Sequence, residues 1–560
     1  MKILYLDIET EGLNPFEAPV VTAQVLNGKV HIFQGDEIGQ LKSVLESSLI
    51  VGHNLKFEQK FLKYHYGINL NHIYDTWLAE IIISGGLQAG RQGTRLQDLA
   101  KKYCDIDMSK EQQTTFKRGQ ELTPEQIEYA ALDVQVLPEI MKAQQEQIKA
   151  LNLEDTANIE MAAIPGMSWL ELSGMPINIE MLEDLRIKTL DRKYKAVNKC
   201  LEHLKEGNKE QQRTLTGEQV LDINLNSHEQ LKQVLNNMGI PCKSTAEAEL
   251  KKFDHPVINC ILEYKEAEKL LNTFIEKQKN YIDSTTGRIH ANFNQYGAHS
   301  GRFTCSKPNL QQQPNSTEWR SIYKAQEGNK IITADYSQIE LRILAQVSKD
   351  PAFIEAYKTG QDLHKLTASK IFNKPLDEIT KQERQVAKTV NFGTVYGIGG
   401  KGLKKNLENA GIKVTEDEAK QFIKAFYEGY PYVNVYLRNA QRHGLENLSI
   451  RNAANRYHKF YAPEDERQKG YIKRQCQNMP IQSLCADMVK IAIANLYRIL
   501  EPEGVRFINC VHDELVFECS EDQAEYVVDT VKVEMEKAGE LYLDKVPVIA
   551  EVSISDAWIK

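Results

Sequence analysis

The stretch that decides the fold is Ile331-Ile332-Thr333-Ala334-Asp335-Tyr336-Ser337-Gln338-Ile339-Glu340-Leu341-Arg342. Its first residues are apolar or β-branched, which favours a buried strand. Asp335 follows at the end of that strand, where a buried carboxylate can meet solvent and a metal ion. Taken alone, such a strand-end Asp is more often a turn residue than a ligand.

A second acidic segment lies far downstream, at Asn509-Cys510-Val511-His512-Asp513-Glu514-Leu515-Val516. Apolar runs flank its charged centre on both sides. This arrangement predicts a β-hairpin with Asp513 and Glu514 at its tip. Taken alone, the second segment is as weak an indication of a catalytic site as the first.

Between the two acidic segments, four side chains recur at steps of four residues: Arg384, Lys388, Phe392 and Tyr396. Such steps rotate only about 40° around a helix, so the four side chains form one stripe. Cations at one end and aromatics at the other suit a phosphate tail and a stacked base. For an isolated helix, a solvated basic face beside core-facing aromatics is the more common origin of this pattern.

The composition indicates a multidomain protein of a reducing compartment. The chain has 560 residues, 42% of them hydrophobic, which is enough for more than one core. Its net charge of -8 argues against a uniformly basic surface that binds nucleic acid indiscriminately. The nine cysteines lack zinc-type spacing, so no disulfide framework is expected. No signal peptide or membrane-length apolar run is visible, and we expect a cytoplasmic protein without membrane contact.

The order of elements predicts α/β and α+β domains in one chain. Residues 1–150 alternate short strands with helices, which is typical of an α/β domain. From 156 to 279 the sequence predicts long, mostly exposed helices. Strands are expected again at 288–295, 330–334, 507–511 and 515–519, so a helical insertion interrupts the last domain.

The N-terminal domain contains a second set of acidic residues. Asp7 and Glu9 alternate on the first predicted strand, so both point to the same face. Tyr129 and Asp133 are spaced i, i+4 on one face of a predicted helix. Glu58 ends the segment Gly52-His53-Asn54-Leu55-Lys56-Phe57-Glu58. An acidic pair on a strand is weak evidence by itself, and the set as a whole is stronger.

In this order, the three segments around Asp335, Lys388 and Asp513 resemble the signature motifs of family A DNA polymerases almost letter for letter. The resemblance extends through Gly301-Arg302-Phe303, Pro308-Asn309-Leu310-Gln311, Asp362-Leu363-His364 and Arg474 to Gln482, and it covers nearly the whole chain. It implies that a primer 3′-hydroxyl attacks the α-phosphate of a deoxynucleoside triphosphate. Two Mg²⁺ ions, for which Mn²⁺ can substitute, would be held by carboxylates.

The resemblance also assigns roles to residues of the polymerase half. The expected metal ligands are Asp335, the Tyr336 carbonyl and Asp513, with Glu514 secondary. The triphosphate would be bound by Arg384, Lys388 and His364, and Lys388 would also protonate the leaving pyrophosphate. Phe392 would lie against the sugar and base, and Tyr396 beside the template base.

Further roles concern sugar selection and the duplex. Glu340 is expected to act as a steric gate against a ribose 2′-hydroxyl, which favours DNA over RNA synthesis. Contacts to the incoming nucleotide and the primer–template are expected from Gln338, Arg302, Asn309, Arg474, Asn478, Gln482 and His512. Minor-groove acceptors are nearly the same for every correct pair, so such contacts check shape rather than sequence.

The N-terminal residues resemble the 3′→5′ proofreading exonucleases that combine four acids with a Tyr. The resemblance implies an RNase H-like domain in which Asp7, Glu9 and Asp133 bind metal and Tyr129 orients the attacking water. Glu58 departs from the family, which usually has Asp there. We expect Glu58 to be a ligand, and the alternative is that it faces solvent or pairs with Lys56 or Lys60.

The implied architecture is an exonuclease domain followed by a right-hand polymerase. We expect the exonuclease at 1–150, linker and thumb at 151–290, palm at 291–342 and 471–560, and fingers at 343–470. No 5′-nuclease domain is expected before the exonuclease. The open alternative is the same polymerase with a weak or inactive exonuclease. A nuclease with a merely DNA-binding second half and a non-catalytic clamp are disfavoured, because both carboxylate sets are complete. Primer–template DNA and deoxynucleoside triphosphates are the implied partners, with replisome proteins as open additions.

Overall fold

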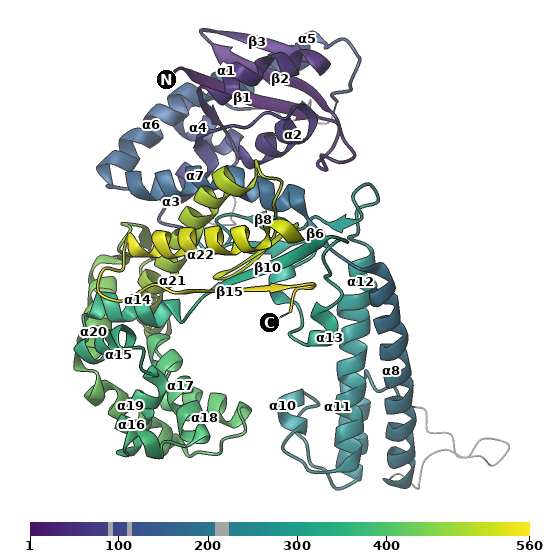
Figure 1. Ribbon diagram of the computed structural model, residues 1–560, viewed down its shortest axis with the longest axis vertical. Helices are drawn as coiled ribbons and strands as arrows, with labels where there is room; N and C mark the ends of the chain where they lie inside the picture. Colours follow the sequence, from purple (N-terminus) through teal and green to yellow (C-terminus); the bar gives the residue numbers. More distant parts are fainter. Residues whose placement is uncertain (88–92, 109–114, 208–222, 560) are drawn as a thin grey trace, which may run out of the picture.

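The computed structural model describes residues 1–87, 93–108, 115–207 and 223–559. The chain builds two main sheets, each covered by its own helices, and one helix, α7 (Glu154–Ser173), lies between the two parts (Figure 1). None of the described helices combines the length and the apolar character that a membrane span requires.

The N-terminal part is a mixed five-stranded sheet in the order β3-β2-β1-β4-β5. Its first three strands are antiparallel, and β4 and β5 continue the sheet parallel to β1. The strands are β1 (Ile3–Thr10), β2 (Val20–Asn27), β3 (Lys29–Gln34), β4 (Leu49–Gly52) and β5 (His72–Asp75). The helices are α1 (Lys42–Glu46), α2 (Lys56–Tyr66), α3 (Thr76–Ile83), α4 (Leu96–Cys104), α5 (Pro124–Gln135) and α6 (Leu137–Ala150). The α/β prediction for 1–150 is therefore confirmed.

The second sheet is fully antiparallel and has the order β13-β14-β10-β15. Its strands are β10 (Asn329–Tyr336), β13 (Arg506–Val511), β14 (Glu514–Ser520) and β15 (Ala550–Ser555). Helix α22 (Ala524–Glu540) packs on β10, β14 and β15, α7 packs on β13, and α21 (Glu466–Leu500) packs against both of these helices. Because β10 pairs with strands from the far end of the chain, it brings its own carboxyl end next to the β13–β14 turn.

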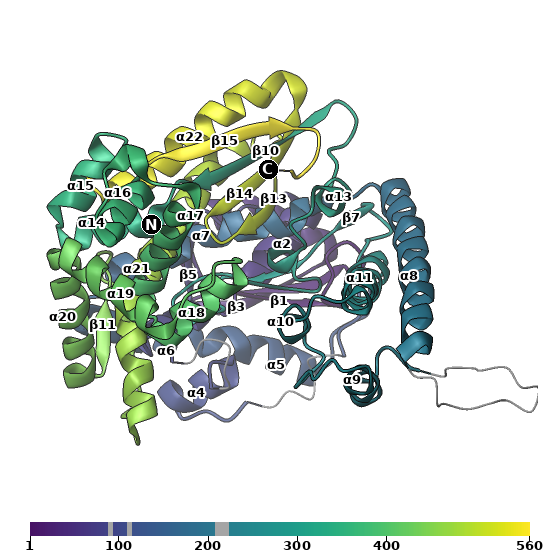
Figure 2. The ribbon, with the colours of Figure 1, turned by 90° about the horizontal axis from the view of Figure 1, so that it is seen from below.

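Two groups of helices lie on opposite sides of this sheet (Figures 1 and 2). One group contains α8 (Ile179–Gly207), α9 (His228–Asn237), α10 (Glu247–Leu250), α11 (Pro256–Lys269) and α12 (Glu276–Lys279). The other contains α14 (Ile339–Ser348), α15 (Pro351–Lys358), α16 (Leu363–Phe372), α17 (Lys381–Val395), α18 (Gly400–Asn409), α19 (Glu416–Gly429) and α20 (Pro431–Asn447). Smaller elements are α13 (Thr317–Arg320), β6 (Met175–Pro176), β7 (Arg288–Ile289), β8 (Asn292–Asn294), β9 (Thr304–Ser306), β11 (Ser449–Arg451) and β12 (Tyr457–Lys459).

Helix α7 corrects one prediction, because it is almost wholly buried rather than mostly exposed. It packs against α2 of the first part and against α21 and β13 of the second. Between 156 and 173 the only charged side chains are Glu160 and Glu171, and a helix that is apolar on every side is buried. That composition was the signal for a helix placed between two cores.

The predicted strand at 288–295 is also divided in the structure. Its first residues form β7, which pairs with β6, and its last residues form β8, which pairs with β9. The chain changes partner at His290, whose Nδ1 lies 2.8 Å from the carbonyl oxygen of Glu171. Alternation in the sequence records that a segment is extended, and it does not record which strand is its neighbour.

Candidate active sites

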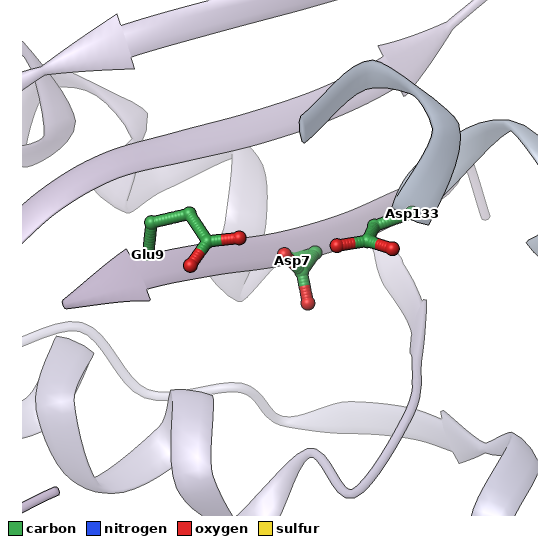
Figure 3. Close-up of side chains that lie close together, drawn as sticks. All are labelled: Asp7, Glu9 and Asp133. Atoms are coloured by element: carbon green, nitrogen blue, oxygen red, sulfur yellow. The ribbon is translucent and has the colours of Figure 1, made fainter. Parts of the chain in front are cut away.

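Three carboxylates meet at the edge of the N-terminal sheet. Asp7 and Glu9 project from one face of β1, and Asp133 reaches them from α5 (Figure 3). Each offers an oxygen, and these oxygens all lie within 4.8 Å of one another. The sequence prediction that brings these three residues together is therefore correct in its geometry.

Local chemistry fixes both elements. Helix α5 begins at Pro124, and the side chain of Thr123 accepts a hydrogen bond from the backbone N–H of Gln126 at 3.2 Å. On β1, Asp7 lies in register with Gln24 of β2, whose Nε2 donates to the Asp7 carboxylate at 2.5 Å. Gln24 was not predicted as a site residue, because a single amide in a buried strand carries no sequence signal of its own.

The electrostatics of this cluster favour a cation. Burial, and then the neighbouring carboxylates, raise the pKa of Glu9 to about 10. Burial and the charge of Asp133 raise the pKa of Asp7 well above its ordinary value. Hard carboxylate oxygens at this spacing are the donor set that Mg²⁺ prefers, and a bound cation would remove the repulsion that disfavours the ionised forms. The residues present therefore fit a divalent metal.

Glu58 belongs to the same site. It is 4% exposed and lines a cleft of about 750 Å³ together with Asp7, Glu9, Tyr129 and Asp133. Its Oε2 atom is buried and has no hydrogen-bond partner among the described residues. Burial and the charge of Asp7 raise the pKa of Glu58 well above its ordinary value. A divalent cation bound at the acidic cluster would give this buried oxygen a partner.

The alternative interpretation of Glu58 is wrong. The side chain does not face solvent, and the two nearby lysines are engaged elsewhere: Lys56 and Lys60 both bind Glu171 of α7, each at 2.6 Å. Asp75 was another unpredicted participant. Its buried carboxylate accepts from the backbone N–H groups of Asn54 at 3.1 Å and Leu55 at 2.7 Å, and so fixes the start of α2. The strand-to-helix step at Asp75 was the available signal.

Tyr129 lines the cleft beside the acidic residues. Burial, and then Asp133, Glu9 and Asp7, raise the pKa of its phenol above the ordinary value. The phenol therefore keeps its proton at neutral pH and can donate a hydrogen bond. Trp77 and Phe116 line the same cleft; Trp77 is partly exposed there, and Phe116 is buried in its wall.

The second acidic site lies at the end of the antiparallel sheet. Asp335 is near the end of β10, in register with Glu514 at the start of β14. Asp513 and His512 form the two-residue turn between β13 and β14, and His512 has a left-handed backbone. Burial, and then the charge of Asp335, raise the pKa of Asp513 to about 7. The predicted hairpin is confirmed, and the two aspartates are close enough to repel.

Glu514 and Tyr336, which stand next to the two aspartates in sequence, direct their side chains to other partners. Glu514 is buried and accepts a hydrogen bond from Nε1 of Trp558 at 2.9 Å. The Tyr336 hydroxyl donates to the carbonyl of Met535 at 2.6 Å, so its side chain packs toward α22. These contacts agree with a secondary role for Glu514 and leave only the backbone of Tyr336 for the site.

The predicted stripe lies on α17, with Tyr396 at its C-terminal end. Lys388 is exposed, and Arg384 donates from Nε to Asp362 at 2.6 Å. His364 is buried, with Nδ1 2.9 Å from Nδ2 of Asn391. Burial outweighs the charge of Asp362 and lowers the pKa of His364 to about 4. His364 is therefore a neutral hydrogen-bonding group at physiological pH rather than a cation.

Glu340 joins two other predicted residues. It accepts hydrogen bonds from the Arg302 guanidinium and from the Tyr396 hydroxyl. Tyr396, Phe392 and Arg474 line a cleft of about 560 Å³ at the end of α17. Gln338 precedes α14 with a left-handed backbone, and its Oε1 accepts from the hydroxyl of Tyr357 at 3.3 Å. The hydrogen bond from Tyr396 thus connects Glu340 to the residues that line this cleft.

The remaining predicted DNA-contacting residues lie around the same sheet edge and on α21. Arg474, Asn478 and Gln482 share one helix, and Asn478 keeps a buried Oδ1 with no partner among the described residues. Asn309 has a local task, because its side chain accepts from the backbone N–H of Gln311 at 3.0 Å. The Gln311 amide in turn donates to the carbonyl of Cys510 at 3.2 Å, next to the acidic turn.

Two carboxylate sites, one on the N-terminal mixed sheet and one on the antiparallel sheet, agree with a polymerase joined to a nuclease. Comparison with known proteins gives the same result. The family model described as DNA polymerase family A matches residues 188–560, and the model described as 3′-5′ exonuclease matches residues 1–149. The chain belongs to DNA polymerase family A and is a DNA-directed DNA polymerase with a 3′–5′ exonuclease domain. Both families depend on divalent metal ions.

Similar proteins include the DNA polymerase I of Aquifex aeolicus, which is 29% identical over all of this chain and 96% of its own length. The DNA polymerase I of Pseudomonas aeruginosa is 30% identical over 92% of this chain, which spans only 57% of that protein. A solved structure described as the POL domain of Pol1 from M. smegmatis, in complex with DNA primer-template and dNTP, matches 99% of this chain at a TM-score of 0.82 and 25% identity.

Proposed function

We propose that this polymerase extends a primer at the site of Asp335 and Asp513 and trims the primer 3′ end at the site of Asp7, Glu9, Glu58 and Asp133. The observation that carries the proposal is the coexistence of two separate acidic sites on two sheets of one chain. DNA primer–template and deoxynucleoside triphosphates are the proposed substrates, supported by the complex that the M. smegmatis structure contains.

In the polymerase site, each residue has a task that its position supports. Asp335, Asp513 and the Tyr336 carbonyl are placed at adjoining strand ends, with Glu514 behind them. Bound Mg²⁺, or Mn²⁺ in its place, would lower the charge on the attacking and leaving oxygens. Lys388 is exposed on α17, where its ammonium can bind a phosphate and give a proton to the leaving pyrophosphate. Arg384 and neutral His364 add hydrogen bonds to the triphosphate.

Sugar and base are recognised one turn further along α17. Phe392 and Tyr396 supply aromatic surface, and Glu340 is held by Arg302 and Tyr396 so that its methylene groups occupy a fixed place. A fixed side chain can exclude a 2′-hydroxyl, whereas a mobile one could move aside. Contacts to the duplex and the nucleotide come from Gln338, Arg302, Asn309, Arg474, Asn478, Gln482 and His512.

In the exonuclease site, side chains of the protein supply most of the negative charge that would bind the metal ions. Asp7, Glu9 and Asp133 converge, and Glu58 contributes a buried oxygen from α2. Tyr129 keeps its proton and can orient a water toward the terminal phosphodiester. Trp77 can stack against an unpaired terminal base. The proposal is therefore an active exonuclease, in preference to the inactive alternative.

We further propose the division of the chain into exonuclease (1–150), linker and thumb (151–290), palm (291–342 and 471–560) and fingers (343–470). The two helix groups on opposite sides of the β10 sheet support the thumb and fingers (Figure 2). A cytoplasmic place in replication or repair is supported by the bacterial DNA polymerase I relatives. Replisome proteins are further proposed partners.

One experiment tests the whole proposal. A labelled primer–template, paired or mispaired at its 3′ end, is incubated with Mg²⁺ and with or without nucleotides. We expect extension with nucleotides, trimming without them, and trimming before extension on the mispaired end. Extension without any trimming, in a preparation of verified composition, would support the inactive exonuclease instead.

A further inference from the structure

Helix α2 carries Glu58 on one face and two lysines on the other. Lys56 and Lys60 are four residues apart and share a face. Glu58 is two residues from each, which places it about 200° around the helix. Any rotation of α2 that moves the lysines therefore moves the Glu58 carboxylate in the exonuclease cleft.

Both lysines form ion pairs with a single carboxylate, which belongs to a residue beyond position 150. Glu171 of α7 binds Lys56 through Oε1 and Lys60 through Oε2, each at 2.6 Å. The side chain of Glu171 is 4% exposed, and those of the lysines are 15% and 17% exposed. Ion pairs at this depth are screened far less than pairs on the surface.

The same carboxylate also binds β8 of the polymerase half. The backbone N–H of Phe293 donates to Oε1 of Glu171 at 2.8 Å, and Lys56 donates from Nζ to the Phe293 carbonyl at 2.5 Å. Burial raises the pKa of Glu171, but Lys56 and Lys60 outweigh burial and leave that pKa below its ordinary value. The ionised carboxylate of Glu171 thus links α7, on which it lies, to α2 and to β8.

The Glu58 carboxylate has a hydrogen bond to its own backbone. Its Oε2 has no partner among the described residues, so the position of its carboxylate depends on the position of the α2 backbone. A shift of about 1 Å in a catalytic group can cost roughly a hundredfold in rate. The contacts that hold α2 therefore bear on the position of Glu58 in the cleft.

We propose that Glu171 is a positioning residue of the exonuclease: through Lys56 and Lys60 it sets the rotation of α2, and thereby the distance from Glu58 to the Asp7–Glu9–Asp133 cluster. The inference rests on the proposed role of Glu58 as a metal ligand. It means that the exonuclease site is completed by a residue of the linker helix.

The test is the Glu171→Gln variant of the full chain, which keeps the size of the side chain and removes its charge. Single-turnover excision of a mispaired primer is measured over a range of Mg²⁺ concentrations. We expect the Mg²⁺ concentration for half-maximal excision to rise about tenfold, the scale typical for groups that orient metal ligands. Primer extension should stay within about twofold of the wild type, which shows that the variant is folded.

The matched control is Lys63→Met. Lys63 also lies on α2 and also forms an ion pair with the polymerase half, to Glu501 at 2.8 Å, but the two side chains are 25% and 20% exposed. We expect unchanged excision in this variant, because a better screened pair contributes little. Lys60→Met should reproduce part of the Glu171→Gln defect.

The decisive measurement combines Glu171→Gln with Glu58→Gln. If Glu171 acts through Glu58, adding Glu171→Gln to Glu58→Gln should cause no further loss of excision. The effects of substitutions at coupled residues are not additive. Equal excision by Glu171→Gln and wild type at every Mg²⁺ concentration would overturn the inference, as would a full additional loss in the double variant. A Glu58→Gln variant with wild-type excision would instead remove Glu58 from the site and the inference with it.

Discussion

The two acidic sites differ in how completely the protein assembles them. In the exonuclease site, four carboxylates and a protonated Tyr129 line one cleft, and the pKa values of Asp7, Glu9 and Glu58 all rise there. In the polymerase site, Asp335 and Asp513 act on each other, while Glu514 is bound by Trp558 and Glu340 by Arg302 and Tyr396.

Under the proposed function, this difference follows from the substrates. A phosphodiester at a primer end brings one charge, so an exonuclease that uses two metal ions would have to supply the remaining negative ligands itself. A triphosphate brings several anionic oxygens, so the polymerase needs fewer carboxylates and adds the cations of α17 instead. One site is complete before its substrate binds, and the other is completed by its substrate.

The largest expected effect separates the two sites. Asp513→Ala should lower primer extension at least about a hundredfold, because the loss of a metal ligand misplaces the reacting groups. Trimming should persist in this variant. Asp7→Ala with Glu9→Ala should show the opposite pattern. Paired extension and excision assays on each variant check this, and a joint loss of both activities in either one would contradict separate sites.

The next prediction concerns stability without and with metal. In metal-free buffer, Asp7→Asn should raise the melting temperature, because it removes one of the repelling carboxylates. Each kcal/mol gained in the free energy of unfolding corresponds to a rise of about 2–4 °C. Mg²⁺ should raise the melting temperature of the wild type more than that of the variant. Differential scanning calorimetry in chelator and in Mg²⁺ measures both. A variant that gains as much from Mg²⁺ as the wild type does would place the ion elsewhere.

The pH dependence of the metal-free protein sharpens the same point. The pKa of Glu9 is about 10 in the folded chain and 4.5 in its ordinary state. The stability linked to its proton is therefore fully present below pH 4.5 and is lost as pH rises toward 10. Glu9→Gln should flatten this decline in thermal unfolding curves, and an unchanged slope would show that burial and the neighbouring carboxylates do not raise the pKa of Glu9.

A smaller effect is expected at Glu340. Glu340→Ala should admit ribonucleotides about tenfold to a hundredfold more readily relative to deoxyribonucleotides, because the pocket loses a side chain of fixed position. The variant also frees Arg302 and the Tyr396 hydroxyl, so ordinary synthesis should slow. Relative kcat/KM for the two sugars is the measurement. Unchanged discrimination would show that another group excludes the 2′-hydroxyl.

The smallest effect is expected at His364. Its pKa is about 4 in the folded chain and 6.5 in its ordinary state. The unfolded chain therefore binds a proton first, and stability is present above pH 6.5 and lost as pH falls toward 4. As pH falls from 6.5 toward 4, the melting temperature of His364→Gln should decline less than that of the wild type. Equal slopes of melting temperature against pH would indicate a solvated imidazole.

Residues close in sequence or at regular spacing were predictable. Strand alternation placed Asp7 and Glu9 on one face, and the i, i+4 step placed Tyr129 and Asp133 together. The apolar runs around Asp513 gave the hairpin, because a two-residue turn between β-formers has few other solutions. Motif resemblance then supplied the roles that spacing could not.

Contacts between distant segments were not predictable. Nothing near Lys56 or Lys60 in the chain indicates Glu171 as their partner, and the acidic neighbour at Glu58 suggested the wrong pair. Glu160 of α7 likewise lies in a fully buried group with Arg456, Asp487 and Lys490, which follow it in the chain by 296, 327 and 330 residues. Such pairs depend on how two cores pack, which local propensity does not encode.

The sequence by itself determined the two families of motif, the strands and helices that carry them, and the chemistry of their carboxylates and cations. Only the tertiary structure decided that Glu58 is buried in the exonuclease cleft, that Glu340 is held by Arg302 and Tyr396, and that α7 joins both halves. The physical reason is that periodicity fixes the direction of a side chain relative to its own backbone. Its partner, its burial and its pKa are fixed by whatever the rest of the chain packs against it.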